Sequence, residues 1–477
     1  MMISLILAVV MAAPQPDVKA HAEAALRAWS VPGIAVAVVE PERVLHMGGY
    51  GVRETGKAEP VTEHSTFQIA STTKAFTAAA VAMLADEGKM SFDDPVRKHL
   101  DFFRLADPHA DALVTIRDLL THRTGLPRHD VLWVRTGLTR EELIRRIGLA
   151  RPTASFRNQY QYQNLMFTSA AEAVGRASGL GWDGFLAQRI FAPLGMKDSS
   201  SLYAEMVRHG DMAMPHVKDK AQPWGNYDNI GGAGSIASSV HDLARWVRMQ
   251  LGGGVFEGRR LISEVSLGET HSPQMVNRLV SPTRELQPDF SQTTYGMGWT
   301  INHYRGEMLI MHAGVLNGFR ALITMAARRK LGLIVLANQN GTNLPEALTN
   351  TLLDEYLGLE KKRDWNAHML AVTRTNEEKT EREKREREAA RKQNTKPSLE
   401  LEAYAGVYRE PAYGEARLRL VDGVLQLEWL RLKTELKHWH HDTFLVKANE
   451  QLVQFRLNEK GSPVELKLFD QVFVRQP

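Results

Sequence analysis

Ser71 and Lys74 stand three residues apart in the run Ser71-Thr72-Thr73-Lys74, which follows an apolar segment and opens an alanine-rich helix. Unpaired N–H groups at a helix N-terminus stabilise negative charge that develops nearby. A lysine three residues further on lies on the same helix face, so its amine can reach the serine hydroxyl. A desolvated lysine can take the serine proton or bias a neighbouring base, which makes the hydroxyl a nucleophile. The pair predicts covalent acyl transfer, although an N-cap serine beside a solvent-facing lysine would give the same short pattern.

Two further motifs follow in the expected chain order. The segment Tyr160-Gln161-Tyr162-Gln163-Asn164 contains a Tyr-x-Asn spacing, and His312-Ala313-Gly314 stands between a strand-like segment and a glycine-containing turn. With these motifs, about residues 31–340 resemble the serine β-lactamase and penicillin-binding protein superfamily, specifically the class C β-lactamases and their esterase and D-aminopeptidase relatives. Further landmarks of the resemblance are 119–127 (LLTHRTGLP), 231–235 (GGAGS), 242–244 (DLA) and 295–299 (YGMGW).

The resemblance implies proton-transfer roles for three side chains. Ser71 would be the acylated nucleophile, Lys74 its hydrogen-bonded activator, and Tyr162 the phenol or phenolate that exchanges protons with Ser71 and the leaving group. A tyrosine has a pKa near 10, so this role requires nearby cations, which Lys74 and His312 would supply. Tyr160 is the alternative to Tyr162, but the Tyr-x-Asn spacing selects Tyr162 and leaves Tyr160 as a packing aromatic.

The same resemblance implies a substrate-binding set. Asn164 would hold the substrate amide and orient Lys74. The backbone N–H groups of Ser71 and Val315 would form the oxyanion hole. Gly314 would leave room for the acyl group, which a side chain at that position would crowd.

Two positions depart from the class C pattern. His312 stands where class C β-lactamases have a lysine, and the histidine form is commoner in the esterase and peptidase branches. Because histidine titrates near neutral pH, we expect recognition of a substrate carboxylate to be weaker or pH-dependent. His129, two residues after Pro127, replaces a glutamine that often contacts the substrate amide. Both changes argue against an efficient β-lactamase.

The elements that must position these residues read as a mixture of helices and strands. Segments 33–39 and 44–51 predict a hairpin after a helix at 20–29, and 308–312, 319–325 and 331–337 are strand-like. Helical periodicity dominates between them. Strands at both ends of the region predict an α+β fold in which one antiparallel sheet packs with a helical subdomain. We expect this β-lactamase/transpeptidase-like domain to span residues 14–360.

The composition changes after this domain. Residues 377–392 are almost wholly charged with mixed sign, which predicts a solvated helix or flexible linker within 361–398 rather than a basic docking arm. Residues 399–477 predict a small antiparallel β-barrel. The segments 404–408, 413–414 and 438–440 resemble the lipocalin-like domain that follows some of these catalytic domains. Six strand-like segments are expected there, at 404–408, 417–421, 425–430, 443–446, 452–457 and 464–469.

The composition of the 477-residue chain excludes several classes of function. The chain has no cysteine, which removes disulfides, thiolate metal sites and cysteine nucleophiles. Its 59 basic and 55 acidic residues leave too small an imbalance for nucleic-acid binding. The apolar run 3–13 predicts a signal peptide over residues 1–13, and hence export to the periplasm or the extracellular space; it is too short to span a membrane.

Other motifs point away from phosphate, metal and α/β-hydrolase chemistry. The segment 51–58 nearly matches a phosphate-binding loop, but Ala58 stands where a Ser or Thr is required, so we expect a hairpin turn. His438, His440 and His441 have no acidic third ligand at a suitable spacing, which favours ordinary core or surface histidines. The sequence lacks Gly-x-Ser-x-Gly around Ser71 and lacks His-Glu-x-x-His.

The sequence therefore predicts an exported serine hydrolase that needs no metal or cofactor. Small acyl esters or D-amino-acid-containing peptides would be its substrates, with β-lactams as slow substrates or inhibitors. The alternative is a non-catalytic protein that holds peptidoglycan peptides in the same cleft. The intact set Ser71, Lys74, Tyr162 and Asn164 favours the enzyme. The sequence leaves the natural substrate and the oligomeric state open, a homo-oligomer included.

Overall fold

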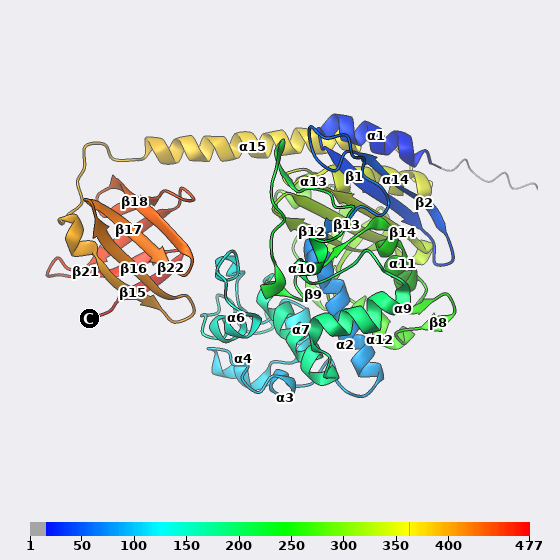
Figure 1. The fold of residues 1–477 in the computed structure, drawn as a ribbon, viewed down its shortest axis with the longest axis horizontal. Helices are drawn as coiled ribbons and strands as arrows, with labels where there is room; N and C mark the ends of the chain where they lie inside the picture. The colour runs from blue at the N-terminus through cyan, green and yellow to red at the C-terminus, as the bar shows by residue number, and fades with distance from the viewer. Residues whose placement is uncertain (1–15, 362) are drawn as a thin grey trace, which may run out of the picture.

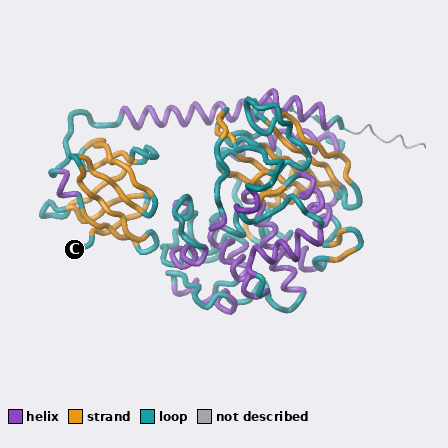
Figure 2. Tube along the Cα trace, viewed as in Figure 1, coloured by secondary structure: helices purple, strands orange, loops and turns teal. Residues whose placement is uncertain are grey.

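The computed structural model describes residues 16–361 and 363–477. The predicted signal peptide lies outside these residues. Figure 1 shows a large mixed body and a small β-barrel joined by the long helix α15, and Figure 2 shows that strands are concentrated in two separate places. None of the helices in the described residues is long and apolar enough to cross a membrane.

An eight-stranded antiparallel sheet lies at the centre of the large body, in the order β2-β1-β14-β13-β12-β11-β10-β9. β1 pairs with β14, so the two ends of this region meet in one sheet, as the sequence predicts. The predicted hairpin coincides with β1 and β2. The strands are β1 (Gly33–Val39), β2 (Val44–Gly51), β9 (Met275–Val276), β10 (Phe290–Tyr295), β11 (Thr300–Tyr304), β12 (Glu307–Leu316), β13 (Phe319–Ala326) and β14 (Leu331–Ala337).

Helices cover both faces of this sheet, which is why all seven residues of β1 are buried. Ile34, Val36 and Val38 pack with α1 (Val18–Trp29) and α14 (Leu344–Tyr356). The alternate residues of β1 pack with α2 (Thr73–Asp86) and α11 (Val240–Leu251). A strand that is buried on both faces reads as a continuous apolar run, which matches the sequence GIAVAVV.

The remaining helices form the helical subdomain and its edges, and α7 packs against α2. They are α3 (Val96–His99), α4 (Pro108–Leu113), α5 (Ile116–Leu120), α6 (Arg140–Ile147), α7 (Asn164–Ser178), α8 (Gly181–Phe185), α9 (Ala192–Leu194), α10 (Tyr203–Met206), α12 (Glu264–Thr270) and α13 (Thr283–Leu286). Three two-stranded ribbons complete the body: β3 (Phe67–Gln68) with β6 (Ala237–Ser238), β4 (His216–Val217) with β5 (Lys220–Ala221), and β7 (Val255–Phe256) with β8 (Arg259–Arg260). The α+β fold is confirmed.

The charged segment after the sheet domain is helical. α15 (Trp365–Ala389) begins with Trp365 and Met369 buried against the large body, and its second half is solvated. Lys379 and Glu383 form an i,i+4 ion pair on this exposed stretch, an arrangement that supports a helix without a packed face. The segment is thus a solvated helix that leads to the barrel (Figure 1).

The C-terminal barrel is closed, because its first strand pairs with its last. It has eight strands instead of the six that the sequence predicts: β15 (Gly406–Glu410), β16 (Gly414–Val421), β17 (Val424–Trp429), β18 (Leu432–His440), β19 (Thr443–Val446), β20 (Leu452–Leu457), β21 (Pro463–Leu468) and β22 (Gln471–Arg475). The additional strands are β18 and β22. Only Leu436 and Trp439 of β18 and Phe473 of β22 are buried, so neither strand carries a strong apolar alternation.

Candidate active site

A sharp turn from strand to helix places Ser71. The ribbon strand β3 leads into the one-turn 3₁₀ helix Ala70–Thr72, and α2 begins at Thr73. Ala70 is buried with a φ of 51°, a left-handed conformation that costs free energy for a residue with a side chain. Such strain directly before a nucleophile is typical of functional sites, where the surrounding packing holds the turn in place.

Strand β12 approaches this turn closely, and Gly314 makes the approach possible. A Cβ atom at Gly314 would lie 2.2 Å from the backbone oxygen of Ile69 and 3.1 Å from Cβ of Ala70. The family resemblance implied that Gly314 is a glycine because a side chain would crowd the acyl group. The structure gives a different reason, because a side chain would push β12 away from the turn that carries Ser71.

Two polar side chains contact Ser71, and a third joins them through Lys74. The Tyr162 hydroxyl donates to Ser71 Oγ at 2.8 Å, and Lys74 Nζ lies 3.0 Å from the same oxygen. Lys74 Nζ also donates to Asn164 Oδ1 and to the carbonyl oxygen of Ala233, both at 2.8 Å. The four polar residues that the motifs singled out are thus joined in one hydrogen-bonded cluster.

Burial determines the charge state of this cluster. Lys74 is fully buried, and its desolvation, with a smaller contribution from the Arg128 charge, holds its pKa well below the usual value. Desolvation raises the pKa of Tyr162. The sequence analysis expected nearby cations to lower the tyrosine pKa, and the structure reverses this expectation. Both shifts favour the uncharged forms, a neutral amine beside a protonated phenol.

Lys74 Nζ donates to three acceptors, Asn164 Oδ1, the Ala233 carbonyl oxygen and Ser71 Oγ. When the amine is neutral, its two N–H groups serve Asn164 and Ala233, and its lone pair faces Ser71. Ser71 can then donate its hydroxyl proton to Lys74 while it accepts the proton of Tyr162. In this arrangement the serine proton already points at a base.

Asp130 and Arg128 support the cluster, and the sequence analysis missed both. Asp130 Oδ1 accepts hydrogen bonds from Asn164 Nδ2 at 2.8 Å and from the indole of Trp133 at 2.9 Å. Arg128 Nε donates to Asp130 Oδ2 at 2.7 Å, and its guanidinium lies 4.7 Å from the centre of the Tyr162 ring. The signal that could have indicated them is their place directly after the Leu119–Pro127 landmark.

His312 is buried behind the cluster in a neutral form. Its Nδ1 lies 2.8 Å from the carbonyl oxygen of Ala313, which can only accept, so Nδ1 carries the proton. Its Nε2 lies 3.2 Å from the Tyr295 hydroxyl, which can donate to it. Burial lowers the pKa of His312 to about 3. The sequence-based expectation that His312 is a cation or titrates near neutral pH is therefore wrong. The ring is buried, so no solvent stabilises a charge on it.

His129 and Tyr160 lie away from Ser71. His129 Nδ1 is 2.9 Å from the hydroxyl of Tyr413 in the barrel, so this histidine contacts the C-terminal domain, and its neighbours Arg128 and Asp130 line the cavity in its place. The expected contact between His129 and the substrate is therefore not supported by its position. Tyr160 packs against Tyr295 at a ring distance of 5.2 Å, in keeping with a packing aromatic.

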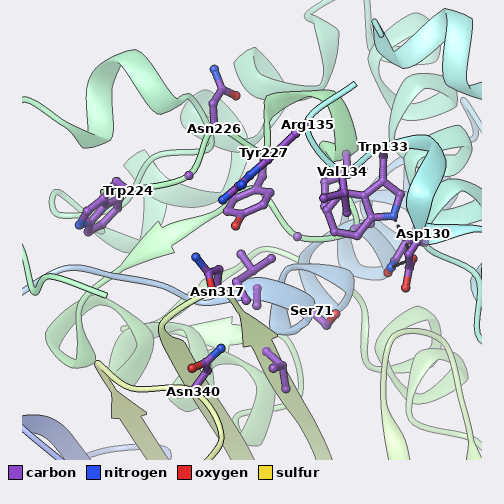
Figure 3. Close-up of a pocket in the computed structure, with 18 of the residues that line it drawn as sticks. Ser71, Asp130, Trp133, Val134, Arg135, Trp224, Asn226, Tyr227, Asn317 and Asn340 are labelled. Carbon is purple, nitrogen blue, oxygen red and sulfur yellow. Dashed lines mark hydrogen bonds between the residues drawn. The ribbon is translucent and has the colours of Figure 1, made fainter. Parts of the chain in front are cut away.

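A cavity of about 1200 Å³ opens beside Ser71. Val315, which is 51% exposed, lines this cavity from β12. Ser71 and Val315, whose N–H groups the resemblance assigns to an oxyanion hole, therefore line the same cavity. Figure 3 shows Ser71 and Asp130 at one end and Trp224 with Asn226 at the other. The rest of the wall carries aromatic rings, side-chain amides and three arginines, namely Trp133, Tyr227, Gln222, Asn317, Asn340, Arg128, Arg135 and Arg431.

Arg431 is the one lining residue contributed by the barrel. Its guanidinium lies against Gly137, where a Cβ atom would meet it at 2.2 Å. The structure shows that the barrel closes part of the cavity wall.

The cavity itself offers no metal-binding set. Among the described residues that line it, Asp130 is the only carboxylate and no histidine is present. The three histidines near the end of β18 have other partners: His438 Nε2 lies 2.9 Å from the carbonyl oxygen of His441, and His440 Nδ1 accepts from the backbone N–H of Lys392.

Comparison with known proteins decides the family. The model of the family described as beta-lactamase matches residues 18–358. This chain belongs to the beta-lactamase family. The matched region holds the whole cluster around Ser71. Residues 390–476 match a separate model, a domain of unknown function (DUF3471), which corresponds to the barrel of this family member.

Individual relatives include a hydrolase, a penicillin-binding protein homologue and SurE. The unguisins hydrolase ungD of Aspergillus violaceofuscus is 29% identical over 434 residues, covering 84% of this chain and 76% of the relative. The octameric penicillin-binding protein homologue from Pyrococcus abyssi has a TM-score of 0.63 at 22% identity, covering 96% of this chain and 99% of the other. SurE has a TM-score of 0.59 at 18% identity, covering 96% and 98%. Both structures share the fold with this beta-lactamase family hydrolase.

Proposed function

We propose that this hydrolase forms an acyl-enzyme on Ser71 and cleaves amide or ester bonds of peptides. The observation that carries the proposal is the shared hydrogen bonding of Ser71 Oγ with Lys74 and Tyr162 at the edge of a large cavity. A nucleophile, a base and a proton donor within hydrogen-bond distance of one atom are what acyl transfer requires.

In the acylation step, Ser71 Oγ attacks the substrate carbonyl carbon while its proton moves to Lys74 Nζ. The carbonyl oxygen becomes an oxyanion, which the backbone N–H groups of Ser71 and Val315 would stabilise. When the bond to the leaving group breaks, the leaving atom takes a proton from Tyr162, and Tyr162 recovers it from the Lys74 ammonium. Water then attacks the acyl carbon with Lys74 as base, and Ser71 leaves with a proton.

The cavity favours peptides over short-chain esters. Its volume exceeds that of most sites for small ligands. Side-chain amides such as Asn317 and Asn340 can pair with peptide groups, and Trp224 and Tyr227 offer apolar surface. Arg135 and Arg431 have no ion-pair partner among the described residues, so they are available to bind a substrate carboxylate. Peptides with a free carboxylate are therefore the preferred class.

The names of two relatives bear on the substrate class. One is the unguisins hydrolase, and another similar structure is that of SurE with D-Leu, with a TM-score of 0.57 at 18% identity. We include D-amino-acid-containing peptides among the proposed substrates for this reason. β-Lactams would react slowly, because His312 replaces the lysine of class C enzymes.

Mass spectrometry after incubation with a fluorophosphonate or a penicillin tests the mechanism. We expect one adduct on the peptide that contains Ser71, and no adduct in Ser71→Ala. An adduct that persists in Ser71→Ala would reject the assignment. A panel of D-amino-acid amides, peptides with free carboxylates, p-nitrophenyl esters and nitrocefin then ranks substrates. A protein that binds these peptides but turns over none of the panel would support the non-catalytic binding alternative.

Export and assembly are separate proposals. We infer from the apolar run 3–13 that the protein is exported, and N-terminal sequencing of the protein secreted by its host would show cleavage before residue 14. We also propose a homo-oligomer, since the Pyrococcus homologue is octameric. Light scattering on the purified protein would return the monomer mass, 53.5 kDa for the whole chain, if this proposal is wrong.

A further inference from the structure

A cluster of histidine and aspartate side chains lies outside the catalytic cavity. His64 precedes β3, Asp198 follows α9, and His241 stands in the first turn of α11. One potential ligand atom from each of these three residues lies within 4.8 Å of the other two. His64 Nδ1 is 2.9 Å from Asp198 Oδ2, and the rings of His64 and His241 are 4.5 Å apart. Three segments that are distant in the sequence thus bring donor atoms to one point.

We propose that His64, Asp198 and His241 bind a first-row transition-metal dication, with Zn²⁺ as the fitting ion. Imidazole nitrogens together with a carboxylate are ligands that Zn²⁺ accepts, whereas Mg²⁺ and Ca²⁺ prefer sets made only of oxygen. A tetrahedral ion with bonds of about 2.0–2.2 Å holds its ligand atoms about 3.4 Å apart. The ligand atoms of the cluster all lie within 4.8 Å of one another, so binding needs only small side-chain movements.

A second layer of contacts orients two of these ligands. Asp242 Oδ1 lies 3.1 Å from Nδ1 of His241, which fixes the proton on that nitrogen and leaves Nε2 for a cation. The Ser239 hydroxyl donates to Asp198 Oδ2 at 2.8 Å. A carboxylate behind a histidine ligand is the usual support in zinc sites, where it fixes the tautomer and raises the basicity of the imidazole. A plain surface ion pair between His64 and Asp198 would not require this support.

His209 lies beside the cluster, outside the three-residue ligand set. Its Nε2 lies 3.5 Å from Asp198 Oδ1, on the carboxylate oxygen that His64 does not use. The side chains of His64, His209 and His241 are 49%, 28% and 29% exposed, so an ion can reach the cluster from solvent. With these three protein ligands, a water takes the fourth position of a tetrahedral ion.

The proposed ion is structural. None of its ligands lines the cavity beside Ser71. The site joins the segment before β3 to the start of α11, and β3 leads directly to the turn that carries Ser71. A bound ion therefore stabilises the folded state by binding it and not the unfolded chain, and leaves the chemistry of the cavity unchanged.

The test uses the full-length protein without a histidine tag, stripped with EDTA and titrated with ZnCl₂ by calorimetry. We expect one saturable site, a rise in Tm with Zn²⁺ but not with Mg²⁺, and an intense visible absorption when Co²⁺ is added. The Co²⁺ spectrum reports tetrahedral ligation in the unmodified protein, so the proposal can be checked even where a variant fails to fold. Absence of saturable binding, or a Co²⁺ spectrum of the free aquo ion, would overturn it.

Variants locate the site. His64→Ala and His241→Ala should abolish the Tm rise, and Asp242→Asn should weaken Zn²⁺ binding by about 10–100-fold. His440→Ala is the matched control, because it removes a surface histidine of the barrel and should leave Zn²⁺ binding unchanged. Loss of binding in His440→Ala with retention in His64→Ala would place the ion on the barrel and reject the proposal. Hydrolysis rates of stripped and loaded protein should be equal, and a Zn²⁺-dependent rate would contradict the structural role.

Discussion

The Asp130 carboxylate accepts a hydrogen bond at 2.8 Å from the side-chain amide of Asn164. This bond fixes the orientation of the amide, so that its oxygen faces Lys74 Nζ at 2.8 Å. Asp130 thereby acts on the reaction through Asn164 and through its charge. It is a positioning residue whose charge also raises the pKa of Lys74.

Asp130→Asn and Arg128→Gln should shift the acidic limb of the pH–rate profile in opposite directions. Activity requires neutral Lys74, so the rate rises as pH passes the pKa of Lys74. The negative charge of Asp130 raises this pKa and the positive charge of Arg128 lowers it. Asp130→Asn should therefore move the limb to lower pH, and Arg128→Gln to higher pH. The pH dependence of labelling by a neutral fluorophosphonate measures the position of this limb without a contribution from substrate binding. Shifts of the limb in the same direction in both variants would contradict the assignment of Lys74 as base.

His312 should contribute no pH limb near neutrality. Because burial lowers its pKa to about 3, the side chain stays neutral across the working range. His312→Asn is expected to lower the rate through lost packing against Tyr295, while the shape of the pH–rate profile between about pH 5 and 8 is retained. Loss of a limb near pH 6 in this variant would show that His312 titrates in the active enzyme.

Tyr162→Phe and Tyr160→Phe form a matched pair. Tyr162 donates to Ser71, and removal of this proton donor should lower kcat by about 10²–10⁴-fold. Tyr160 contacts Tyr295 as a packing ring, so loss of its hydroxyl should change kcat by only a few-fold. Steady-state kinetics on one amide substrate decides between the two tyrosines. Equal losses in both variants would mean that neither hydroxyl has the assigned role.

Arg431→Ala tests whether the barrel helps to bind substrate. We expect the KM for a peptide with a free carboxylate to rise about tenfold, because a charged hydrogen bond is lost. The same peptide with an amidated end should show an unchanged KM. Labelling of Ser71 by a small neutral probe should also be unchanged. Equal effects on both peptides would assign Arg431 to domain packing instead.

His271 should make the protein sensitive to acid. Burial lowers its pKa to about 4, below the 6.5 of an unfolded chain, so protons bind preferentially to the unfolded state below about pH 6.5. Its contribution to stability is present above pH 6.5 and is lost as pH falls toward 4. Thermal melts of His271→Gln should show a smaller loss of Tm over this interval than the wild-type protein. Parallel Tm curves would contradict the pKa shift.

Short-range spacing made much of the site predictable. Ser71 and Lys74 are one helical turn apart, and Tyr162 and Asn164 flank the start of α7, so short motifs together with the family resemblance indicate all four. The continuous apolar run of β1 likewise indicates a strand that is buried on both faces. β18 was missed because few of its side chains are buried, so its sequence shows little of the apolar alternation that predicts a strand.

The sequence by itself determined the α+β and barrel architecture, because these follow from local periodicity. Its short motifs and the family resemblance also indicated Ser71 and its neighbours as the candidate site. Only the tertiary structure decided that Arg431 of the barrel reaches the cavity, that His129 faces Tyr413, and that His64 meets His241. It also decided the protonation of Lys74 and His312. Contacts between distant segments and the removal of water from a charged group arise only when the chain packs, so no local pattern in the sequence carries them.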